Sequence, residues 1–266
     1  MEYEPVKRQV GRLIRKNALP RRMFYKALGV LFLREWYVKR AIRDLNISKM
    51  DNVEILDAGA GFGQYAYYCA RRFPTARILG LEINPDHVSD GNGFSTKMRM
   101  DHLRFEVADI TKITCRDRFD VVLAVDVLEH VEDDEDLLLR FFTALKPEGR
   151  VILSTPSIYR SHADDAEFVG EHVREGYSED EIRRKFANAG FRIKRLTYGY
   201  GFWGDLSWRL GVRNAVRIAG KCRPGKFLSV IYLLFVFPAV LVLMILDYRR
   251  PNRRGTGLVV VAAKPG

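Results

Sequence analysis

Cysteine is scarce in this chain, and the three that are present lie far apart at positions 69, 115 and 222 of 266. An odd number at wide spacing fits neither a disulfide framework nor a zinc site. The basic N-terminal residues are not followed by a continuous apolar stretch, so a secretory signal is not expected. Internal repeats and low-complexity tracts are also absent from the sequence. We therefore expect a globular protein in a reducing, cytosolic compartment.

Acidic residues are rare at both ends of the chain. Residues 1–50 contain 13 Lys and Arg against 4 Asp and Glu, and residues 203–266 contain 11 against 2. The middle segment has more acidic than basic residues, so the net charge of +11 comes from the two ends. Anionic membranes and nucleic acids are the usual partners of such basic segments. Because the sequence has no recognisable nucleic-acid-binding module, we expect no nucleic-acid partner.

Short apolar runs alternate with helical stretches through the middle of the chain. These runs cover 53–57, 77–82, 103–107, 119–125, 150–154, 191–198 and 257–263. The alternation predicts an α/β fold with a Rossmann-like, mostly parallel sheet of seven strands and helices on both faces. Residues 20–46 are expected to form one or two helices ahead of the sheet.

Charges and turn residues mark the ends of two predicted helices. The acidic run Asp133–Asp136 predicts the first turn of one helix, and Lys146–Gly149 is expected to close it. Ser178 and Glu181 form a capping-box pattern, which predicts a second helix that ends at Gly190.

The glycine-rich turn after the first predicted strand is the most informative motif. Glycines at 59, 61 and 63 allow positive φ and bring the backbone within contact distance of a ligand, and a helix is expected from Gln64. A dinucleotide-binding fingerprint has its third glycine where this chain has Gln64, so a dinucleotide is the weaker interpretation. The turn predicts a nucleoside site.

Four predicted strands are each followed by, or end in, a carboxylate: Asp57, Glu82, Asp109 and Asp126. Ligands of open α/β sheets bind at the carboxyl ends of the strands, so these side chains are expected to share one site. Glu82 can accept hydrogen bonds from both hydroxyls of a ribose, and Asp109 could accept one from the exocyclic amine of an adenine. Alternatively, each carboxylate caps a turn between a strand and a helix.

The pattern Asp57-x-Gly-x-Gly-x-Gly resembles motif I of the class I S-adenosylmethionine (SAM) methyltransferases. The segment 126–131, Asp-Val-Leu-Glu-His-Val, and the turn 146–150 are similar to later motifs of that family, which includes the ubiquinone-biosynthesis O-methyltransferases. The resemblance covers residues 50–200 and 257–265, with departures at Ala60, Phe62 and Glu148. It implies S-adenosyl-L-methionine as the cofactor, bound by Asp57, Gly59, Gly61, Gly63, Glu82, Ile83, Asp109, Ile110, Asp126 and Val127.

Methyl transfer from a sulfonium is an in-line displacement, so alignment and the exclusion of water should supply most of the catalysis. An oxygen or nitrogen acceptor must still lose a proton, and His130 and His172 are candidate general bases because imidazole titrates near neutral pH. Alternatively, His130 satisfies a helix N-terminus and His172 lies on the surface. Tyr159 and Arg174 lie in the region where the family places its acceptor.

Some relatives hold a divalent metal in a Glu-x-x-Glu-His pattern. This chain has Asp126, Glu129 and His130 at those places. We expect no metal site.

Residues 227–246 form an almost unbroken apolar run, interrupted by Ser229 and Pro238. As a helix the run would be about 30 Å long, which matches a bilayer core. If 191–198 and 257–263 share one sheet, a single crossing is excluded because it would separate the two strands. The alternatives are a re-entrant or interfacial hairpin turning near Pro238, a lid over the acceptor pocket, or a dimer interface.

Cations and aromatic side chains flank the apolar run on both sides. This arrangement favours peripheral or monotopic association with an anionic membrane surface on its cytoplasmic face. The flanking residues are Arg209, Arg213, Arg217, Lys221, Arg223, Lys226, Arg249, Arg250, Arg253 and Arg254, with Trp203, Trp208, Tyr232 and Tyr248 at expected headgroup depth.

The sequence thus predicts a basic helical segment at 1–49, a SAM-binding core at 50–200, an insertion at 201–256 and a final core strand at 257–266. We predict a methyltransferase whose acceptor is hydrophobic or membrane-held, such as a lipid, a quinone precursor or a lipid-linked glycan. One alternative is a soluble small-molecule acceptor, with the apolar run as a lid or dimer interface. The other is a SAM-binding membrane adaptor without turnover. No oligomeric state is predicted.

Overall fold

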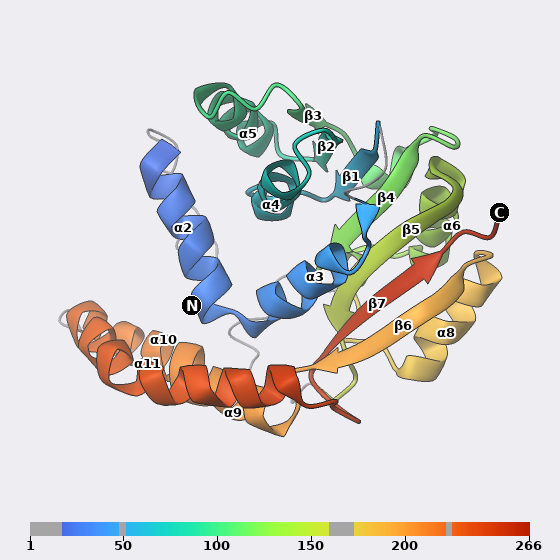
Figure 1. Ribbon diagram of the computed structural model, residues 1–266. Coiled ribbons are helices and arrows are strands. Elements are labelled where there is room, and N and C mark those ends of the chain that lie inside the picture. The colour runs from blue at the N-terminus through green and yellow to red at the C-terminus, as the bar shows by residue number, and fades with distance from the viewer. Residues whose placement is uncertain (1–17, 48–51, 160–172, 222–224) are drawn as a thin grey trace.

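A computed structural model describes residues 18–47, 52–159, 173–221 and 225–266. Within these residues the centre of the molecule is a seven-stranded sheet in the order β3-β2-β1-β4-β5-β7-β6 (Figure 1). β7 is antiparallel to both of its neighbours and the other pairs are parallel, which confirms the predicted fold. The strands are β1 Glu54–Ala58, β2 Arg77–Glu82, β3 Leu103–Val107, β4 Phe119–Val125, β5 Leu145–Pro156, β6 Arg192–Gly199 and β7 Gly257–Ala263.

Helices cover both faces of the sheet. Helices α3 (Leu33–Arg43), α4 (Gln64–Arg72) and α5 (Pro85–Lys97) contribute to the core on one face. Helices α6 (Asp134–Ala144) and α8 (Glu179–Asn188) contribute to the core on the other. Central strands therefore bury side chains on both sides, which explains why their sequences are almost continuously apolar.

The strand order reverses between β1 and β4. From β1 the chain adds β2 and β3 on one side, and then returns to place β4 on the other side of β1. β1 and β4 are parallel and pair through Ala58 and Ala124 near their carboxyl ends. The connections that follow these two strands diverge, and such a switch point is where open α/β sheets bind ligands.

Both predicted helix starts are confirmed by capping hydrogen bonds. The side chain of Asp133 accepts from the backbone N–H of Asp136 at 3.0 Å, and that of Ser178 accepts from the N–H of Glu181 at 3.1 Å. Gly190, just beyond α8, has φ +92°.

The predicted end of α6 is wrong. The helix ends at Ala144, and Leu145 already pairs with Phe119 as the first residue of β5. Pro147 restricts the preceding residue to extended conformations, so the chain leaves the helix before the turn residues. Glu148 then adopts a left-handed φ of +64°, next to a shift in the register of β5 against β4.

The insertion before the last strand forms a helical arm that projects from the sheet (Figure 1). This arm consists of α9 (Phe202–Trp208), the π-helical turn η4 (Arg209–Arg213), α10 (Asn214–Lys221) and α11 (Gly225–Arg249). α11 packs along α9 and α10. Because β6 and β7 pair residue by residue in one sheet, a single membrane crossing by α11 is excluded.

The predicted hairpin near Pro238 is wrong, because α11 continues through this proline as one helix of 25 residues. The residues on either side of Pro238 are apolar, and none of them is a Gly, Asn or Asp that would favour a reversal. The chain reverses instead between α10 and α11.

Candidate functional site

The three glycines after β1 have left-handed backbone conformations, with φ of +74°, +55° and +77° at Gly59, Gly61 and Gly63. A Cβ on Gly59 would lie 2.7 Å from Cγ2 of Val127, and one on Gly63 would lie 2.7 Å from the ring of Phe105. A Cβ on Gly61 would meet nothing within 4 Å. The outer glycines thus pack against protein, while Gly61 borders open space that a ligand can occupy.

Two of the predicted carboxylates support this loop. Asp57 is 2% exposed and accepts a hydrogen bond from the N–H of Ala66 at 2.9 Å, which ties β1 to α4. Burial raises the pKa of Asp57 to about 7, against the opposing effect of this hydrogen bond. Asp57 thus fixes the connection between β1 and α4, which contains the glycine loop.

Glu82 lies at the end of β2, beside the glycine loop. Its carboxylate accepts from the N–H of Gly61 at 2.8 Å and from that of Asn84 at 3.0 Å. A carboxylate has about four acceptor positions, so two stay available for ligand hydroxyls. The position of Glu82 therefore fits a ribose next to Gly61.

Asp109 caps the short helix η2 (Ile110–Lys112). Its carboxylate accepts from the hydroxyl of Thr111 at 2.7 Å and from its N–H at 3.0 Å, and it pairs with Lys112 at 3.1 Å. These contacts, the side-chain hydrogen bond of Thr111 first, lower the pKa of Asp109. The alternative reading, a carboxylate that caps a turn, thus describes Asp109 in this structure.

Apolar side chains lie uncovered at the same edge of the sheet. Ile83, which follows β2, is 69% exposed, and Val107, which pairs with Glu82, is 54% exposed. Ile110 is half-buried. These surfaces suit a flat nucleobase. A separate cavity of about 350 Å³ adjoins Asp109, and its lining does not include the glycine loop.

The residues that follow β4 complete this edge of the sheet. Val127 is buried against Gly59. Asp126 has a left-handed φ of +53° and forms an ion pair with Arg34 at the start of α3. Arg34 is absent from the sequence-based site, because in the sequence it is one cation among many in the basic N-terminal segment.

Helix α2 (Ala18–Leu31) adds two more residues that the sequence did not predict. Arg21 is 3% exposed and donates hydrogen bonds to the carbonyls of Phe62 and Asp90, both at 2.7 Å. The hydroxyl of Tyr25 also donates to the carbonyl of Phe62. Since Phe62 lies between two of the loop glycines, these hydrogen bonds attach the loop to α2. No local motif distinguishes these residues in the sequence.

His130 lies at the end of the short helix η3 (Leu128–His130) and is exposed. Its neighbour Glu129 is 1% exposed and accepts from the hydroxyl of Thr155 at 3.1 Å. Burial raises the pKa of Glu129. The backbone carbonyl of Glu129 accepts from the N–H groups of Val173 and Arg174. His172, the other predicted base, lies outside the described residues.

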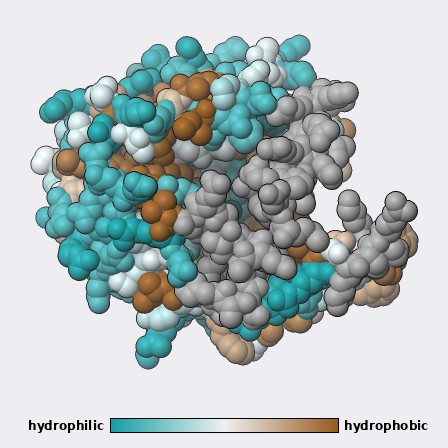
Figure 2. Space-filling view, turned by 180° about the vertical axis from the view of Figure 1, so that it is seen from behind, coloured by the Kyte–Doolittle hydropathy of each residue, from teal (hydrophilic) through white to brown (hydrophobic). Residues whose placement is uncertain are grey.

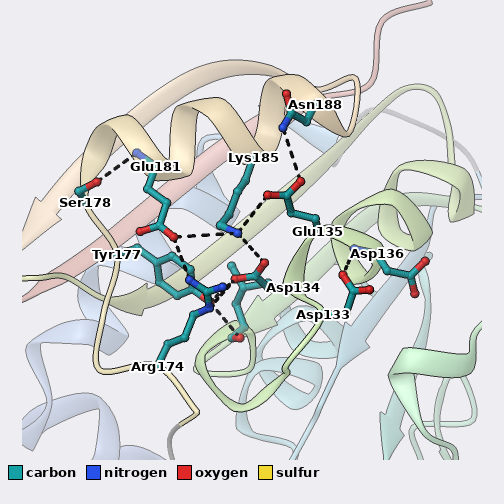
Figure 3. Close-up of polar contacts among 11 residues, drawn as sticks. Asp133, Asp134, Glu135, Asp136, Arg174, Tyr177, Ser178, Glu181, Lys185 and Asn188 are labelled. Carbon is teal, nitrogen blue, oxygen red and sulfur yellow. Dashed lines mark hydrogen bonds and ion pairs between the residues drawn. The ribbon is translucent and has the colours of Figure 1, made fainter.

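A cluster of charges on α6 and α8 holds this region in place (Figure 3). Lys185 is 5% exposed, and its Nζ lies 2.7 Å from Asp134. The hydroxyl of Tyr177 donates to Asp134 at 2.8 Å and to the carbonyl of Leu128 at 3.1 Å. Arg174, expected near the acceptor, pairs with Asp134 at 3.2 Å (Figure 3). The cluster thereby fixes η3 through the contact between Tyr177 and Leu128.

Over the described ranges no three His, Cys, Asp or Glu side chains are placed to hold a metal ion. Two residues of the Glu-x-x-Glu-His position have other partners. Asp126 pairs with Arg34, and Glu129 accepts from Thr155.

Comparison with known proteins agrees with this geometry. The family model described as a methyltransferase domain matches residues 49–190. Phosphoethanolamine N-methyltransferase 1 of Zea mays is 28% identical over 184 residues, which cover 63% of this chain and 36% of that protein. Ubiquinone biosynthesis O-methyltransferase of Bradyrhizobium diazoefficiens is 29% identical over 117 residues, 44% of either chain. The chain thus spans less than half the length of these relatives.

Solved structures share the fold. Phosphoethanolamine N-methyltransferase 2 of Haemonchus contortus, solved in complex with S-adenosyl-L-methionine, aligns with a TM-score of 0.57 at 19% identity, over 81% of this chain and 49% of that one. The [4+2]-cyclase SpnF aligns with a TM-score of 0.57 at 18% identity, over 85% and 80%. At such identities the likeness shows the fold alone, and the second case shows that one fold serves different reactions.

Proposed function

The chain belongs to the methyltransferase-domain family and is a class I SAM-dependent methyltransferase, and from this premise we propose that its acceptor is a hydrophobic or membrane-held molecule. A lipid, a quinone precursor and a lipid-linked glycan are the acceptor classes that fit. The cofactor supplies an electrophilic methyl group on a sulfonium. The glycine loop and Glu82 would hold its nucleoside and tail, and the exposed Ile83 would cover its base.

The observation that carries this proposal is the uncovered apolar surface of the helical arm. Only 11% of the most apolar 18-residue window of α11 is buried. Phe235 is 81% exposed, Leu234 72% and Phe227 69%. Figure 2 shows the apolar colouring on the projecting end of the arm. Monomeric proteins in water rarely expose contiguous apolar patches larger than a few hundred Å².

Charge around the arm supports a membrane rather than a protein lid. Four arginines that follow the apolar run, Arg249, Arg250, Arg253 and Arg254, are exposed. Each cation near an anionic bilayer contributes about 1 kcal/mol of attraction. A single crossing is excluded by the sheet, so the arm would lie in the plane of the interface on the cytoplasmic face.

The base of the arm lies at the carboxyl edge of the sheet, because α9 follows the end of β6. Asp247 on α11 is fully buried and accepts from the hydroxyl of Tyr37 on α3 at 2.8 Å and from the N–H of Gly204 on α9 at 2.9 Å. The same helix α3 begins beside Arg34, which pairs with Asp126. A docked arm would therefore hold the carboxyl edge of the sheet next to the membrane, where a lipid acceptor is concentrated.

Proton removal from the acceptor is assigned to His130. It is exposed at the end of η3, on the connection that follows β4, and imidazole is the side chain that most often serves as a general base. His130→Gln should lower turnover at least about 100-fold, within the usual range for a general base, and leave the affinity for S-adenosylhomocysteine unchanged.

Flotation with vesicles tests the membrane proposal. Wild-type protein should float with vesicles that contain anionic phospholipid, and the double variant L234E/F235E should stay at the bottom of the gradient. Removing each large apolar side chain from the interface forfeits about 1.5 to 3 kcal/mol of transfer free energy, which predicts a loss of affinity of more than tenfold for the pair. Labelled SAM then tests methyl transfer to lipid in the same vesicles.

Leu139→Glu is the matched control, because Leu139 is 50% exposed on α6, across the sheet from α3. This variant should float as wild type does. If folded wild type does not float, the acceptor is a soluble molecule and the arm is a lid or an interface between copies. If the protein floats but transfers no methyl group to any lipid tested, the adaptor alternative is favoured.

A further inference from the structure

The connection from α11 to β7 carries two arginines at the carboxyl edge of the sheet. Arg253 and Arg254 come shortly before Gly257, the first residue of β7, which pairs with the last residues of β5 and β6. The arm joins the sheet at this same edge (Figure 1). In the sheet β7 lies two strands from β4, so its start is about 10 Å from the end of the strand that leads into the cofactor site.

Backbone hydrogen bonds hold this connection against the ends of β5 and β6. The N–H of Ser157 donates to the carbonyl of Thr256 at 3.0 Å, and the N–H of Thr256 donates to the carbonyl of Tyr200 at 3.0 Å. The hydroxyl of Ser157 also donates to the carbonyl of Gly255. The residues that follow Arg254 are therefore fixed to the sheet, which gives its side chain a defined starting point.

The guanidinium of Arg254 packs on an aromatic ring. It lies over Tyr159, which follows β5, at 5.2 Å from the centroid of the ring. Such a contact holds a cation in place without neutralising it. Arg253 and Arg254 are both exposed, and in the described part of the chain neither forms an ion pair, whereas Arg34 and Arg174 have carboxylate partners. The two positive charges are thus available to an anionic ligand.

Exposed apolar side chains lie on the neighbouring segments. Ile158, which precedes Tyr159, is 51% exposed, and Tyr159 itself is 41% exposed. Phe202, the first residue of α9 and of the arm, is 73% exposed. Cations bind an anionic group, and apolar side chains favour the burial of hydrocarbon. This edge of the sheet therefore suits an anionic group that carries a hydrocarbon chain.

Phosphate is the anion that fits two adjacent arginines best. A guanidinium binds phosphate through two parallel N–H donors, and two cations match its charge better than that of a single carboxylate. We propose that Arg254, assisted by Arg253, binds a phosphate group that joins the acceptor to its lipid chain. This inference rests on the proposed function. Within it, the inference selects phosphate-bearing lipids, such as a phospholipid or a lipid-linked glycan, over quinone precursors, which carry no phosphate.

The phosphate would serve as a handle, separate from the atom that receives the methyl group. The lipid chain would lie along the base of the arm, and the group on the other side of the phosphate would reach toward the end of β4. His130, the assigned base, lies on the connection after β4. Phosphate binding and proton removal would therefore use different residues, and loss of the phosphate contact should leave cofactor binding unchanged.

Short prenyl probes test the inference on the full chain saturated with S-adenosylhomocysteine. Geranyl phosphate, geraniol and inorganic phosphate are each titrated by calorimetry. Wild type should bind geranyl phosphate about 10- to 100-fold more tightly than geraniol, as expected for hydrogen bonds between charged groups. It should bind inorganic phosphate more weakly than geranyl phosphate, because the free anion makes no hydrocarbon contacts.

Arg254→Gln removes the positive charge from the handle site. This variant should bind geranyl phosphate about tenfold or more weakly than wild type, as expected for the loss of charge-assisted hydrogen bonds. It should bind geraniol and S-adenosylhomocysteine as wild type does. Arg192→Gln is the matched control, because Arg192 is exposed at the start of β6, at the opposite edge of the sheet. The control should leave every titration unchanged.

Several results would overturn the inference. If wild type does not bind geranyl phosphate, or binds it no more tightly than geraniol, the phosphate is not recognised. If Arg254→Gln keeps the wild-type preference, the anion binds elsewhere on the basic surface. If inorganic phosphate binds as tightly as geranyl phosphate, the site takes the free anion rather than a lipid. Flotation of wild type with anionic vesicles in any of these cases would leave the membrane-held acceptor in place and reject only its phosphate.

Discussion

The sheet core and the helical arm differ in whether their side chains find partners within the chain. In the core, buried charges such as Asp57 and Lys185 have partners within hydrogen-bond distance. In the arm, the largest apolar side chains lie uncovered, with Phe235 at 81% exposed. A core of this kind is complete without a partner, whereas burying the arm requires one. The sheet core, which this chain shares with its family, and the helical arm are thus separate regions of one chain.

The buried ion pair of the core should show the largest effect. Lys185→Met leaves the carboxylate of Asp134, which is 2% exposed, without its closest cation, although Arg174 stays in contact. We expect the free energy of unfolding to fall by about 3 to 5 kcal/mol, the usual result of breaking a buried pair. Urea denaturation measures it.

Arg183→Met on the same helix is the control, because Arg183 pairs with Glu179 at an exposed position. Such surface pairs contribute less than about 1 kcal/mol. Equal losses in the two variants would contradict the distinction between buried and exposed charge in the core.

The ionisation of Asp57 should make the stability of the core depend on pH. Its pKa is about 7 in the folded protein and 3.8 in the unfolded chain, so between these values the folded state binds the proton more tightly. The free energy of unfolding should therefore fall as pH rises through this window, by up to about 1.4 kcal/mol per pH unit. Between pH 5 and pH 7 the free energy of unfolding should fall by about 2 kcal/mol more in wild type than in Asp57→Asn. Denaturation at the two pH values measures this difference. Parallel curves would assign the pH dependence to other groups.

The glycine loop should tolerate no side chain at its first position. Gly59→Ala combines a left-handed φ of +74° with a Cβ 2.7 Å from Val127. We expect a loss of about 1 to 3 kcal/mol in stability, together with weaker binding of S-adenosylhomocysteine. Gly93→Ala, in the interior of α5 with open space around the new methyl group, should be neutral or stabilising. Thermal unfolding with and without ligand compares the two, and equal ligand affinity in both variants would contradict a role for Gly59 at the site.

A substitution on the exposed face of the arm should have the smallest effect on stability and the largest effect on membrane binding. Phe235→Ser removes an exposed ring, so unfolding in the absence of lipid should change by less than about 0.5 kcal/mol. Binding to anionic vesicles should weaken by about tenfold or more. Tryptophan fluorescence can follow both properties. A large loss of stability without lipid would mean that this face of the arm is covered by protein.

Local sequence patterns predicted the strands better than the connections. Each predicted strand is present because apolar runs bounded by Gly, Pro and acidic residues have few alternatives in a parallel sheet. The end of α6 and the turn at Pro238 were wrong. In both places a turn signal in the sequence was overridden by packing. Leu145 pairs in the sheet as the first residue of β5, and the apolar residues around Pro238 continue the helix α11.

The candidate site divides in the same way. The loop glycines, Glu82 and Val127 were predictable because they belong to a contiguous motif or end a strand. Arg21, Tyr25 and Arg34 were not, because each acts on residues more than 30 positions away and resembles any other residue of a basic helix.

By itself the sequence determined the fold class and the cofactor family, and it predicted a site at the carboxyl edge of the sheet, because periodicity and glycine spacing are local properties of the backbone. The tertiary structure decided which charges meet. It paired Arg34 with Asp126, buried Asp57 under the glycine loop, and attached the arm to α3 through Asp247. Contacts of this kind depend on how distant elements pack, and packing is a property of the whole chain rather than of any segment.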